Sequence, residues 1–521
     1  MNPVEPFTPE LLLLGGTLVI FLLDVLGFRQ RALTGGVAVA AILLALGSVL
    51  ADLGVPVLGS FSTLPGGAPY APGLLYGFGL LGLDFQGIFL ASALLVSLAS
   101  LSGTTQGRGV AVFYGLLLLA TLGMLLAAMA ADLIFLLLAL EIVAVSSYLL
   151  VGYTRRESRS LEAAMKFYII GAFSAALSFF GASLLFGAFG TTSLLVVGHS
   201  GALLPGSGSP SLALAGYGFL LVGLGFKVTA VPFHMWAVDV YDGAPDEVSA
   251  FLAGGTKKVG IFAYVLVFLP PLLYFSSRLF SGPSVWTTVS LGLAILAVLT
   301  MTVANLLALM QQEMKRLLAY SSISQAGYML IGVAIGTGPA LAGAGLQVFA
   351  HVFLKAGAFL VVAAVTAIGV GPRVADWRGL GGQRPWLSAS FAVMLLGLAG
   401  IPLTVGFVSK FILFSAAVEA QGWYIWLAVA GLLNSALSVF YYARVLKVMY
   451  LDSAEPEPAT VPGAVSGAAA PSARLAFQGV GIGRAVAIGL CVVVIFAIGV
   501  YPQPVFAALQ AGAQQLVQWG V

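Results

Sequence analysis

The chain has 521 residues, of which 60% are hydrophobic and 8% are charged, and its formal net charge is +3 at pH 7. Soluble globular proteins carry about 25% charged residues, so this composition excludes a soluble globular fold and indicates a membrane protein with many spans. We attribute the small positive charge to loop arginines rather than to a nucleic-acid or acidic partner.

Apolar windows of about 20 residues, the length that an α-helix needs to cross a bilayer, recur along the whole chain. They predict an all-α polytopic membrane protein with about 14 transmembrane helices. The opening segment carries acidic residues where a cleaved signal peptide carries basic ones, so we expect the first window to be retained. The windows are 11–28, 33–53, 83–103, 110–129, 131–152, 160–188, 211–235, 247–270, 285–310, 317–337, 341–369, 388–418, 424–450 and 485–506.

Basic residues in the predicted loops indicate how the chain is oriented, because cytoplasmic loops carry an excess of lysine and arginine. With the N-terminus outside, fifteen basic residues fall in cytoplasmic loops and one, Arg278, falls outside. The sequence therefore predicts both termini on the outer, periplasmic side of a bacterial cytoplasmic (inner) membrane. The fifteen residues are Arg29, Arg31, Arg108, Arg155, Arg156, Arg159, Lys315, Arg316, Arg373, Arg378, Arg384, Arg444, Lys447, Arg474 and Arg484.

Two of the predicted spans contain a proline close to a lysine. Pro232 follows Lys227 by five residues, and Pro402 precedes Lys410 by eight. Proline interrupts a helix, and a broken helix at membrane depth is stable only where protein buries it or where it lines a watery cavity. The paired interruptions predict a transporter with two inverted repeats, whereas the simpler interpretation is ordinary glycine and proline punctuation of membrane helices.

These features divide the chain into five predicted segments. The linker is rich in proline, alanine and glycine, so we expect it to be cytoplasmic and poorly ordered, and we expect 54–82 to be an outer connecting loop. The segments are an N-terminal three-span segment at 1–108, a first repeat of spans four to eight at 109–270, a second repeat of spans nine to thirteen at 285–451, the linker at 452–483 and a C-terminal span at 484–521.

Apart from Arg444 and Lys447, which we assign to the cytoplasmic end of the window 424–450, six lysines and no arginine lie inside the apolar windows. A charge at the membrane midplane costs roughly 3 kcal/mol or more, and deprotonating a lysine at neutral pH costs a similar roughly 4–5 kcal/mol. Because neither protonation state is strongly preferred, such lysines suit a proton carrier. The six are Lys166, Lys227, Lys257, Lys258, Lys355 and Lys410.

One acidic residue, Glu141, lies in the middle of the fifth window without a polar neighbour within one helical turn. We expect it to pair across the bundle with an intramembrane lysine, either as part of a proton relay or as a static ion pair. Lys227, Lys258 and Lys410 are predicted to form a row of proton sites at the midplane. Lys257 and Lys258 project about 100° apart on a helix, so only one of them is expected in the row.

Four further residues are predicted to support the relay. Lys166 follows Glu162 by four residues, a spacing that also fits a surface ion pair. His351 and Lys355 share a helix face, and His234 follows the first break; a buried core histidine is the alternative for both histidines. The short loop after the seventh window carries carboxylates that we expect to cap the eighth span and to hold the loop, whereas the alternative is that they gather protons on the cytoplasmic side. They are Asp239, Asp242, Asp246 and Glu247.

Cofactor motifs are weak in this sequence. The single cysteine, Cys491, excludes an iron–sulfur cluster ligated by the cysteines of this chain alone. The glycines lack the spacing of a phosphate loop, and the three histidines give no evident ligand pair. We therefore expect no cofactor and no metal in this chain, and we assign any redox chemistry to partners.

Five motifs in the interior of the chain resemble, in this order, the proton-pumping antiporter-like subunits of respiratory complex I and of multisubunit cation/proton antiporters. The resemblance implies a fold of fourteen helices with two inverted five-helix repeats and broken helices seven and twelve. It covers roughly residues 80–450. The motifs are ALEIVAVSSYLLVGY, RSLEAAMKFYIIGAFSAALSFFG, GFKVTAVPFHMWAVDVYDGAPDEVSAFLA, KRLLAYSSISQAGYMLIG and GIPLTVGFVSKFILF.

The resemblance also implies roles for individual residues. It matches Glu141 to the glutamate of span five, Lys227 to the lysine of span seven and Lys410 to the site of span twelve. Lys258, which VGIF follows, matches the lysine of span eight better than Lys257 does. Lys166 and His351 match two further recurrent positions. Lys410 and the opening segment PELLLLGGTLVIFLLDVL resemble the N-type subunits of the family.

The resemblance implies a proton-translocating membrane subunit of an NADH:quinone oxidoreductase, without redox catalysis by this chain alone. NADH, FMN, iron–sulfur clusters and quinone would then bind in partner subunits. The expected partners are neighbouring antiporter-like and small membrane subunits and the lipid bilayer, and no nucleic acid. The alternatives are a subunit of an Mrp-type cation/proton antiporter and a non-translocating assembly scaffold.

Overall fold

The computed structural model describes residues 7–53, 79–103, 109–154, 157–199, 210–277, 285–452 and 479–519. Most of the expected outer loop and of the expected linker, and the basic residues Arg108, Arg155, Arg156, Arg278 and Arg474, lie outside the described residues. The described part is helical, apart from loops and two isolated β-bridges, Asp132 with Ser193 and Glu313 with Arg373. The prediction of an all-α fold is confirmed.

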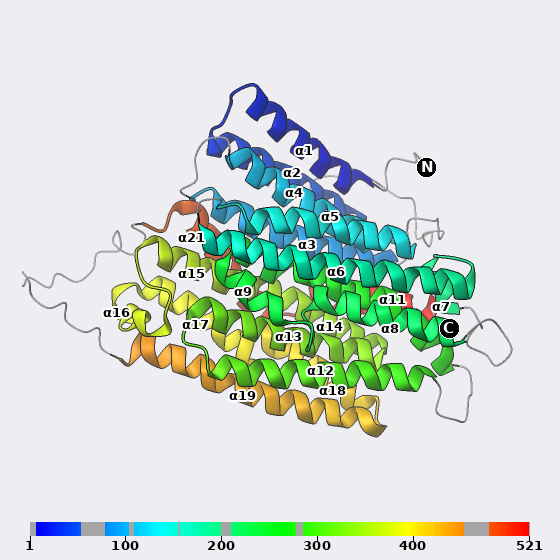
Figure 1. The fold of residues 1–521 in the computed structure, drawn as a ribbon. Helices are drawn as coiled ribbons and strands as arrows, with labels where there is room; N and C mark the ends of the chain where they lie inside the picture. Colours follow the sequence, from blue (N-terminus) through cyan, green and yellow to red (C-terminus); the bar gives the residue numbers. More distant parts are fainter. Residues whose placement is uncertain are drawn as a thin grey trace, which may run out of the picture.

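Long helices pack side by side into one bundle (Figure 1). In the first half of the chain they are α1 (Thr8–Val25), α2 (Arg31–Asp52), α3 (Gly79–Ser100), α4 (Gly109–Ala128), α5 (Leu133–Val151), α6 (Ser158–Phe189), α7 (Leu194–His199), α8 (Pro210–Val228), α9 (Met235–Gly243), α10 (Asp246–Phe251), η3 (Leu252–Thr256) and α11 (Lys257–Ser277). Asp132 accepts hydrogen bonds from the backbone nitrogens of Ile134 and Phe135, which explains why α5 begins at Leu133.

The second half of the chain continues the bundle. Its helices are α12 (Val285–Leu309), α13 (Met314–Ile335), α14 (Gly338–His351), η4 (Val352–Ala356), α15 (Gly357–Ala367), η5 (Val374–Trp377), α16 (Leu380–Gln383), α17 (Pro385–Ala399), α18 (Val405–Glu419), η6 (Gly422–Tyr424), α19 (Ile425–Tyr450), α21 (Ile482–Val500) and α22 (Gln503–Trp519). Gly336 follows the last residue of α13 with φ 72°, the left-handed conformation that commonly ends a helix. α14 has a proline in its first turn.

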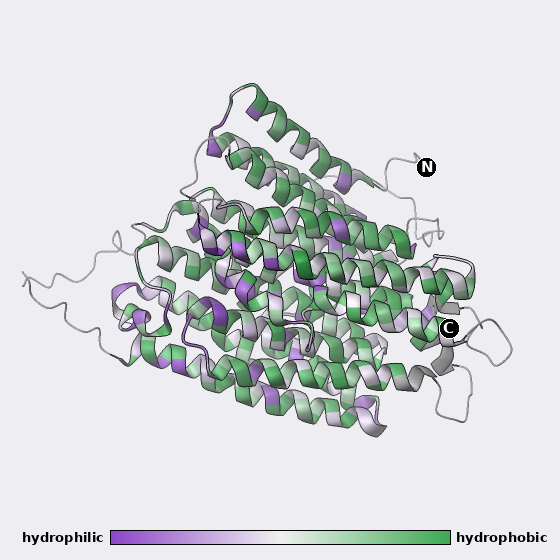
Figure 2. Cartoon of the chain, in the orientation of Figure 1, coloured by the Kyte–Doolittle hydropathy of each residue, from purple (hydrophilic) through white to green (hydrophobic). Residues whose placement is uncertain are grey.

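Thirteen helices of the described residues are long and apolar enough to cross a membrane. Each overlaps one of the predicted windows. The remaining window, 388–418, is divided between α17 and α18, which are shorter because the chain breaks between them. The chain is therefore a multi-pass membrane protein, and most residues along its helices are hydrophobic (Figure 2).

Both predicted helix interruptions are present. α8 ends at Val228 and α9 begins at Met235, and Pro232 lies between them. α17 ends at Ala399 and α18 begins at Val405, with Pro402 between them. The division of the chain into two repeats stays a prediction.

Two short π-helical segments were not predicted from the sequence. η3 lies inside span eight, directly before Lys257, and η4 lies inside span eleven and contains Lys355. They pack against each other, because a Cβ atom added at Gly254 would lie 2.9 Å from the Cβ of Ala356. A π-helical turn carries one extra residue and is frequent at functional sites.

The start of α3 and the helix α22 correct the sequence prediction. α3 begins at Gly79, so residues 79–82 are helical and do not belong to the expected outer loop. The backbone nitrogen of Leu80 donates to Oε1 of Gln515 in α22, 3.0 Å away. α22 follows α21, begins inside the predicted last window at 485–506 and was not predicted as a separate helix.

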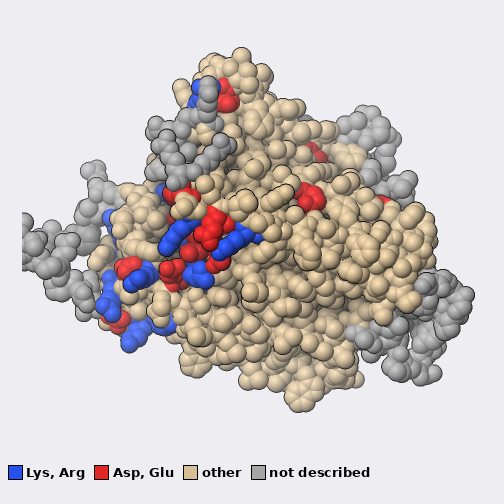
Figure 3. All heavy atoms as spheres, viewed as in Figure 1, with Lys and Arg blue, Asp and Glu red and all other residues tan. Residues whose placement is uncertain are grey.

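Burial differs strongly among the spans. The helices at residues 246–272, 314–335 and 338–367 are almost completely buried, whereas α1, α19 and α21 expose much of their surface. Each of the buried spans carries polar or charged side chains that the bundle removes from lipid. Most visible charges gather in one region of the surface (Figure 3).

Candidate functional site

Lys227 and Glu141 form an ion pair across the bundle. Lys227 lies in the last turn of α8, and its Nζ is 3.6 Å from Oε1 of Glu141 in α5. The same Nζ donates to the carbonyl oxygen of Leu140 at 3.4 Å. The side chains are 11% and 29% exposed, respectively. The structure thus brings together two residues that the sequence predicted to pair.

A small cavity adjoins this ion pair and connects it with span eight. Its volume is about 20 Å³, which accommodates about one water molecule. Lys227 and Lys257 both line it, together with Ser147, Thr256 and the aromatic side chain of Tyr241. The cavity therefore places two lysines from different spans at the same small space.

Lys257 and Lys258 point to different partners, as expected for adjacent residues of a helix. Lys257 donates from Nζ to Oγ of Ser322 at 3.4 Å, and its Nζ lies 5.7 Å from the ring centroid of Tyr241, within cation–π range. Lys258 is fully buried and donates to the carbonyl oxygen of Ala253 at 2.9 Å. The role of Lys258 in a proton row stays a prediction.

Lys355 also reaches α13. It is fully buried in η4, and its Nζ donates to Oγ of Ser321 at 2.6 Å. The Ser321 hydroxyl is also hydrogen-bonded to the hydroxyl of Tyr442 in α19. Lys355 is therefore joined to side chains of spans ten and thirteen by two consecutive hydrogen bonds.

The two histidines of the predicted relay are buried beside this chain of contacts. His351 ends α14, four residues before Lys355, and His234 directly precedes α9. Among the described residues, the two ring nitrogens of His351 have no hydrogen-bond partner, and Nδ1 of His234 has none either. Direct hydrogen bonds thus do not join the histidines to the lysines, and their relay roles stay predictions.

Lys410 lies beneath the second helix break. Its Nζ donates to the carbonyl oxygens of Leu398 at 2.8 Å and Ala399 at 3.4 Å, and to Oγ of Ser435 at 3.1 Å. The two carbonyls belong to the last turn of α17, where helical partners are missing and the helix dipole is negative. The ring centroid of Tyr328 lies 4.5 Å from the same Nζ. The break therefore supplies Lys410 with dipoles in place of a carboxylate.

Sequence analysis missed the polar side chains of α13. Gln325 donates to the carbonyl oxygen of Leu398 at 3.1 Å, which is the carbonyl that Lys410 also contacts. Gln347 donates to Oε1 of Gln325 at 2.7 Å, and Ser409 donates to Gln347 at 2.5 Å. The signal was the polar run SSISQ at residues 321–325 inside an apolar window. α13 therefore carries polar groups from Lys355 to the surroundings of Lys410.

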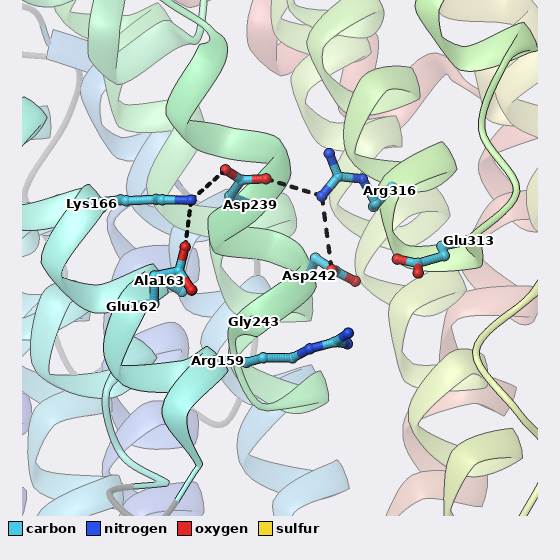
Figure 4. A pocket seen from close by; sticks show the side chains of 9 residues that line it. All are labelled: Arg159, Glu162, Ala163, Lys166, Asp239, Asp242, Gly243, Glu313 and Arg316. Atoms are coloured by element: carbon cyan, nitrogen blue, oxygen red, sulfur yellow. Dashed lines mark hydrogen bonds and ion pairs between the residues drawn. The ribbon is translucent and has the colours of Figure 1, made fainter.

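A charged pocket of about 300 Å³ lies at the surface, apart from these buried lysines. In it, Lys166 contacts Glu162 at 2.8 Å and Asp239 at 2.9 Å, and Arg316 of α13 contacts Asp239 at 3.0 Å (Figure 4). Burial raises the pKa of Asp239, but its hydrogen bonds to Lys166 and Arg316 outweigh burial and keep that pKa below its usual value. The structure thus joins Lys166 to a network of ion pairs that includes the predicted partner Glu162, and its supporting role in the relay stays a prediction.

The acidic loop after span seven forms ion pairs with several elements. Asp246 and Glu247 lie in the first turn of α10, where carboxylates favour the helix dipole, but no side chain caps this helix through a hydrogen bond, so the prediction of capping side chains is wrong. Asp239 and Asp242 lie in α9 rather than in a loop. Asp246 contacts Lys315 at 2.9 Å, and Glu247 contacts Arg484 of α21 at 2.6 Å. The loop therefore fixes span eight to spans ten and fourteen. No group of three metal-binding side chains occurs among the residues that the structure describes, and the expected lack of cofactors stays a prediction.

Several known proteins are similar to this chain. Subunit N of the F(420)H(2) dehydrogenase of Methanosarcina mazei is 39% identical over 460 residues, which cover 86% of this chain and 90% of that protein. Subunit N of the NADH-quinone oxidoreductase of Trichlorobacter lovleyi is 42% identical over 377 residues, which cover 72% of this chain and 74% of that protein.

Solved structures share the fold. A chain of respiratory complex I from Thermus thermophilus with bound aureothin has a TM-score of 0.74 and 30% identity, and the match covers 96% of this chain and 99% of that one. A chain of the Mrp complex from Dietzia sp. DQ12-45-1b has a TM-score of 0.79 at 20% identity and covers all of both chains. The resemblance seen in the motifs is confirmed, because the model of the family described as NADH:quinone oxidoreductase/Mrp antiporter, TM matches residues 130–438. The chain belongs to this family of transmembrane subunits.

Proposed function

We propose that the chain is the N-type, proton-translocating membrane subunit of an NADH:quinone oxidoreductase. The observation that carries this proposal is the series of buried lysines between the two helix breaks, each of which contacts a polar group of another span: Lys227, Lys257, Lys355 and Lys410. The identity with N-type relatives supports the choice of subunit. The chain would lie in a bacterial cytoplasmic membrane with both termini on the outer side.

The first step of the mechanism is the opening of the ion pair between Glu141 and Lys227. While the pair is closed, the carboxylate stabilises the protonated lysine. When the carboxylate moves away, the buried ammonium loses this stabilisation and its proton passes to the next amine. The proton would pass by way of His234 to a lysine of span eight, which is either Lys257 or Lys258.

The last proton site of the row is Lys410. Carbonyl oxygens and a hydroxyl stabilise its ammonium form, and within the described residues no carboxylate lies within ion-pair distance of it. Since dipoles stabilise a buried charge less than a carboxylate does, Lys410 is able to release its proton. His351 and Lys355 support the transfer between span eight and Lys410.

Energy and redox chemistry would come from partner subunits. NADH, FMN, iron–sulfur clusters and quinone would bind there, and neighbouring antiporter-like and small membrane subunits would flank this chain. The row consists of amines, whereas a sodium ion requires oxygen ligands; this chemistry favours protons over the sodium transport of an Mrp-type antiporter. A non-translocating scaffold would need no titratable row.

Replacement of Lys410 tests the proposal. Arginine keeps the charge but does not deprotonate in proteins, so Lys410→Arg should assemble and lose proton transfer. Lys410→Met removes the charge and should also block transfer. The measurement is proton uptake per quinone reduced in inverted membrane vesicles, normalised to assembled complex. Uptake near wild type for Lys410→Arg would show that this lysine does not deprotonate and would favour the scaffold.

A further inference from the structure

Two adjacent serines of α13 bind two lysines that come from different spans. Ser322 accepts from Lys257 at 3.4 Å, and Ser321 accepts from Lys355 at 2.6 Å. Lys257 directly follows η3, and Lys355 lies in η4. Because the two π-helical segments pack against each other, the two amines are directed to the same turn of α13.

Lys257 has a second connection, to the first half of the molecule. It lines the cavity of about 20 Å³ that Lys227 also lines, whereas Lys258 does not. Most of the cavity surface is apolar, but Ser147, Thr256 and the two lysines that line it offer polar partners to a single water. Such a water would bridge the two amines and pass a proton between them. Lys257 is thus the lysine of span eight that touches both the Lys227 cavity and α13.

The charges in this region favour the passage of one proton at a time. Among the described residues, no carboxylate lies within ion-pair distance of Lys257, Lys258 or Lys355. Two ammonium ions buried so close together repel each other strongly in a medium of low dielectric constant. Protonation of Lys257 therefore favours deprotonation of Lys355, so the two lysines hold one proton at a time.

We propose that Lys257, and not Lys258, carries the proton from Lys227 to the second half of the molecule, and that Ser322 and Ser321 position Lys257 and Lys355 for the transfer. This inference rests on the proposed function. In each step an N–H bond breaks at the donating ammonium and an N–H bond forms at the accepting amine. No electrons are transferred, and the donor is left as a neutral amine.

Ser321 continues the route beyond Lys355. Its hydroxyl is hydrogen-bonded to Tyr442, and Gln325, one turn further along α13, shares the carbonyl of Leu398 with Lys410. Lys258 has a different task, because its Nζ bonds the carbonyl of Ala253 within the π-helical segment of its own span. Its contact stabilises the altered backbone of η3.

Serine variants give the mildest test, and α13 offers a matched control. Ser324 is fully buried on the same helix, and its hydroxyl has no hydrogen-bond partner among the described residues. Ser321→Ala and Ser322→Ala each remove a hydrogen bond to a charged group, which corresponds to roughly a tenfold change in rate or more. We expect proton uptake per quinone reduced to fall by about that factor in assembled complex, to stay at wild type in Ser324→Ala, and to recover in Ser322→Thr.

The lysines provide the decisive comparison. Lys257→Met should block proton uptake by the assembled complex, whereas Lys258→Met should retain most of it. The inference is overturned if Lys258→Met blocks uptake, with or without an effect of Lys257→Met, or if Ser322→Ala behaves as Ser324→Ala. These results leave the proposed function standing as long as Lys410→Arg blocks uptake; normal uptake in Lys410→Arg contradicts the proposed function itself.

Discussion

Replacing Glu141 by glutamine removes the charge that stabilises protonated Lys227 but keeps the size of the side chain. At the observed 3.6 Å, the attraction between two unit charges is about 4–5 kcal/mol for an effective dielectric constant of about 20. Both side chains are partly exposed, so we halve this value for solvent screening, to roughly 2 kcal/mol. At about 1.4 kcal/mol for each factor of ten, Glu141→Gln should shift the equilibrium between charged and neutral Lys227 by roughly 30-fold.

The assay is the number of protons taken up per quinone reduced by inverted vesicles, at equal amounts of assembled complex. We expect Glu141→Gln to assemble and to lose most of the proton uptake that depends on this subunit. Glu162→Gln is the matched control, because Glu162 forms a 2.8 Å ion pair with Lys166 at the exposed surface. Normal uptake in an assembled Glu141→Gln complex would refute the reasoning, since the ion pair would then take no part in transfer.

Two further substitutions test the surroundings of Lys410. Gly400 has φ 90°, and a Cβ atom added there would lie 3.2 Å from Cδ of Lys410. Gly400→Ala should therefore destabilise the protein by about 1–2 kcal/mol and lower the midpoint of thermal inactivation. Gly382→Ala is the control and should leave the midpoint unchanged, because an added Cβ has open space there. An unchanged midpoint in Gly400→Ala would contradict the assigned strain. Tyr328→Phe keeps the aromatic ring beside Lys410, so this variant should take up protons normally. Tyr328→Leu removes a buried cation–π contact of about 2 kcal/mol and should slow proton uptake. Equal proton uptake in both variants would exclude a role for the ring.

The sequence by itself determined the membrane spans, the helix breaks and the set of titratable residues. Spans follow from local hydropathy, because a bilayer requires about 20 consecutive apolar residues whatever their neighbours are. The breaks at Pro232 and Pro402 follow from the missing backbone donor of proline. Glu141 was recognisable as a partner for a lysine because a lone carboxylate inside an apolar window requires compensation.

Only the tertiary structure decided how the lysines are connected. Ser322 lies 65 residues from Lys257, and Tyr442 lies 121 residues from Ser321, so no local pattern relates them. The different directions of Lys257 and Lys258 also depend on η3, whose extra residue per turn rotates all the side chains that follow it. The spacing of Lys166 and Glu162 allowed their ion pair to be expected from the sequence, whereas the contact of Lys166 with Asp239 joins two different helices and was not. Partners across a bundle are set by how helices pack, and packing depends on all faces of all helices at once.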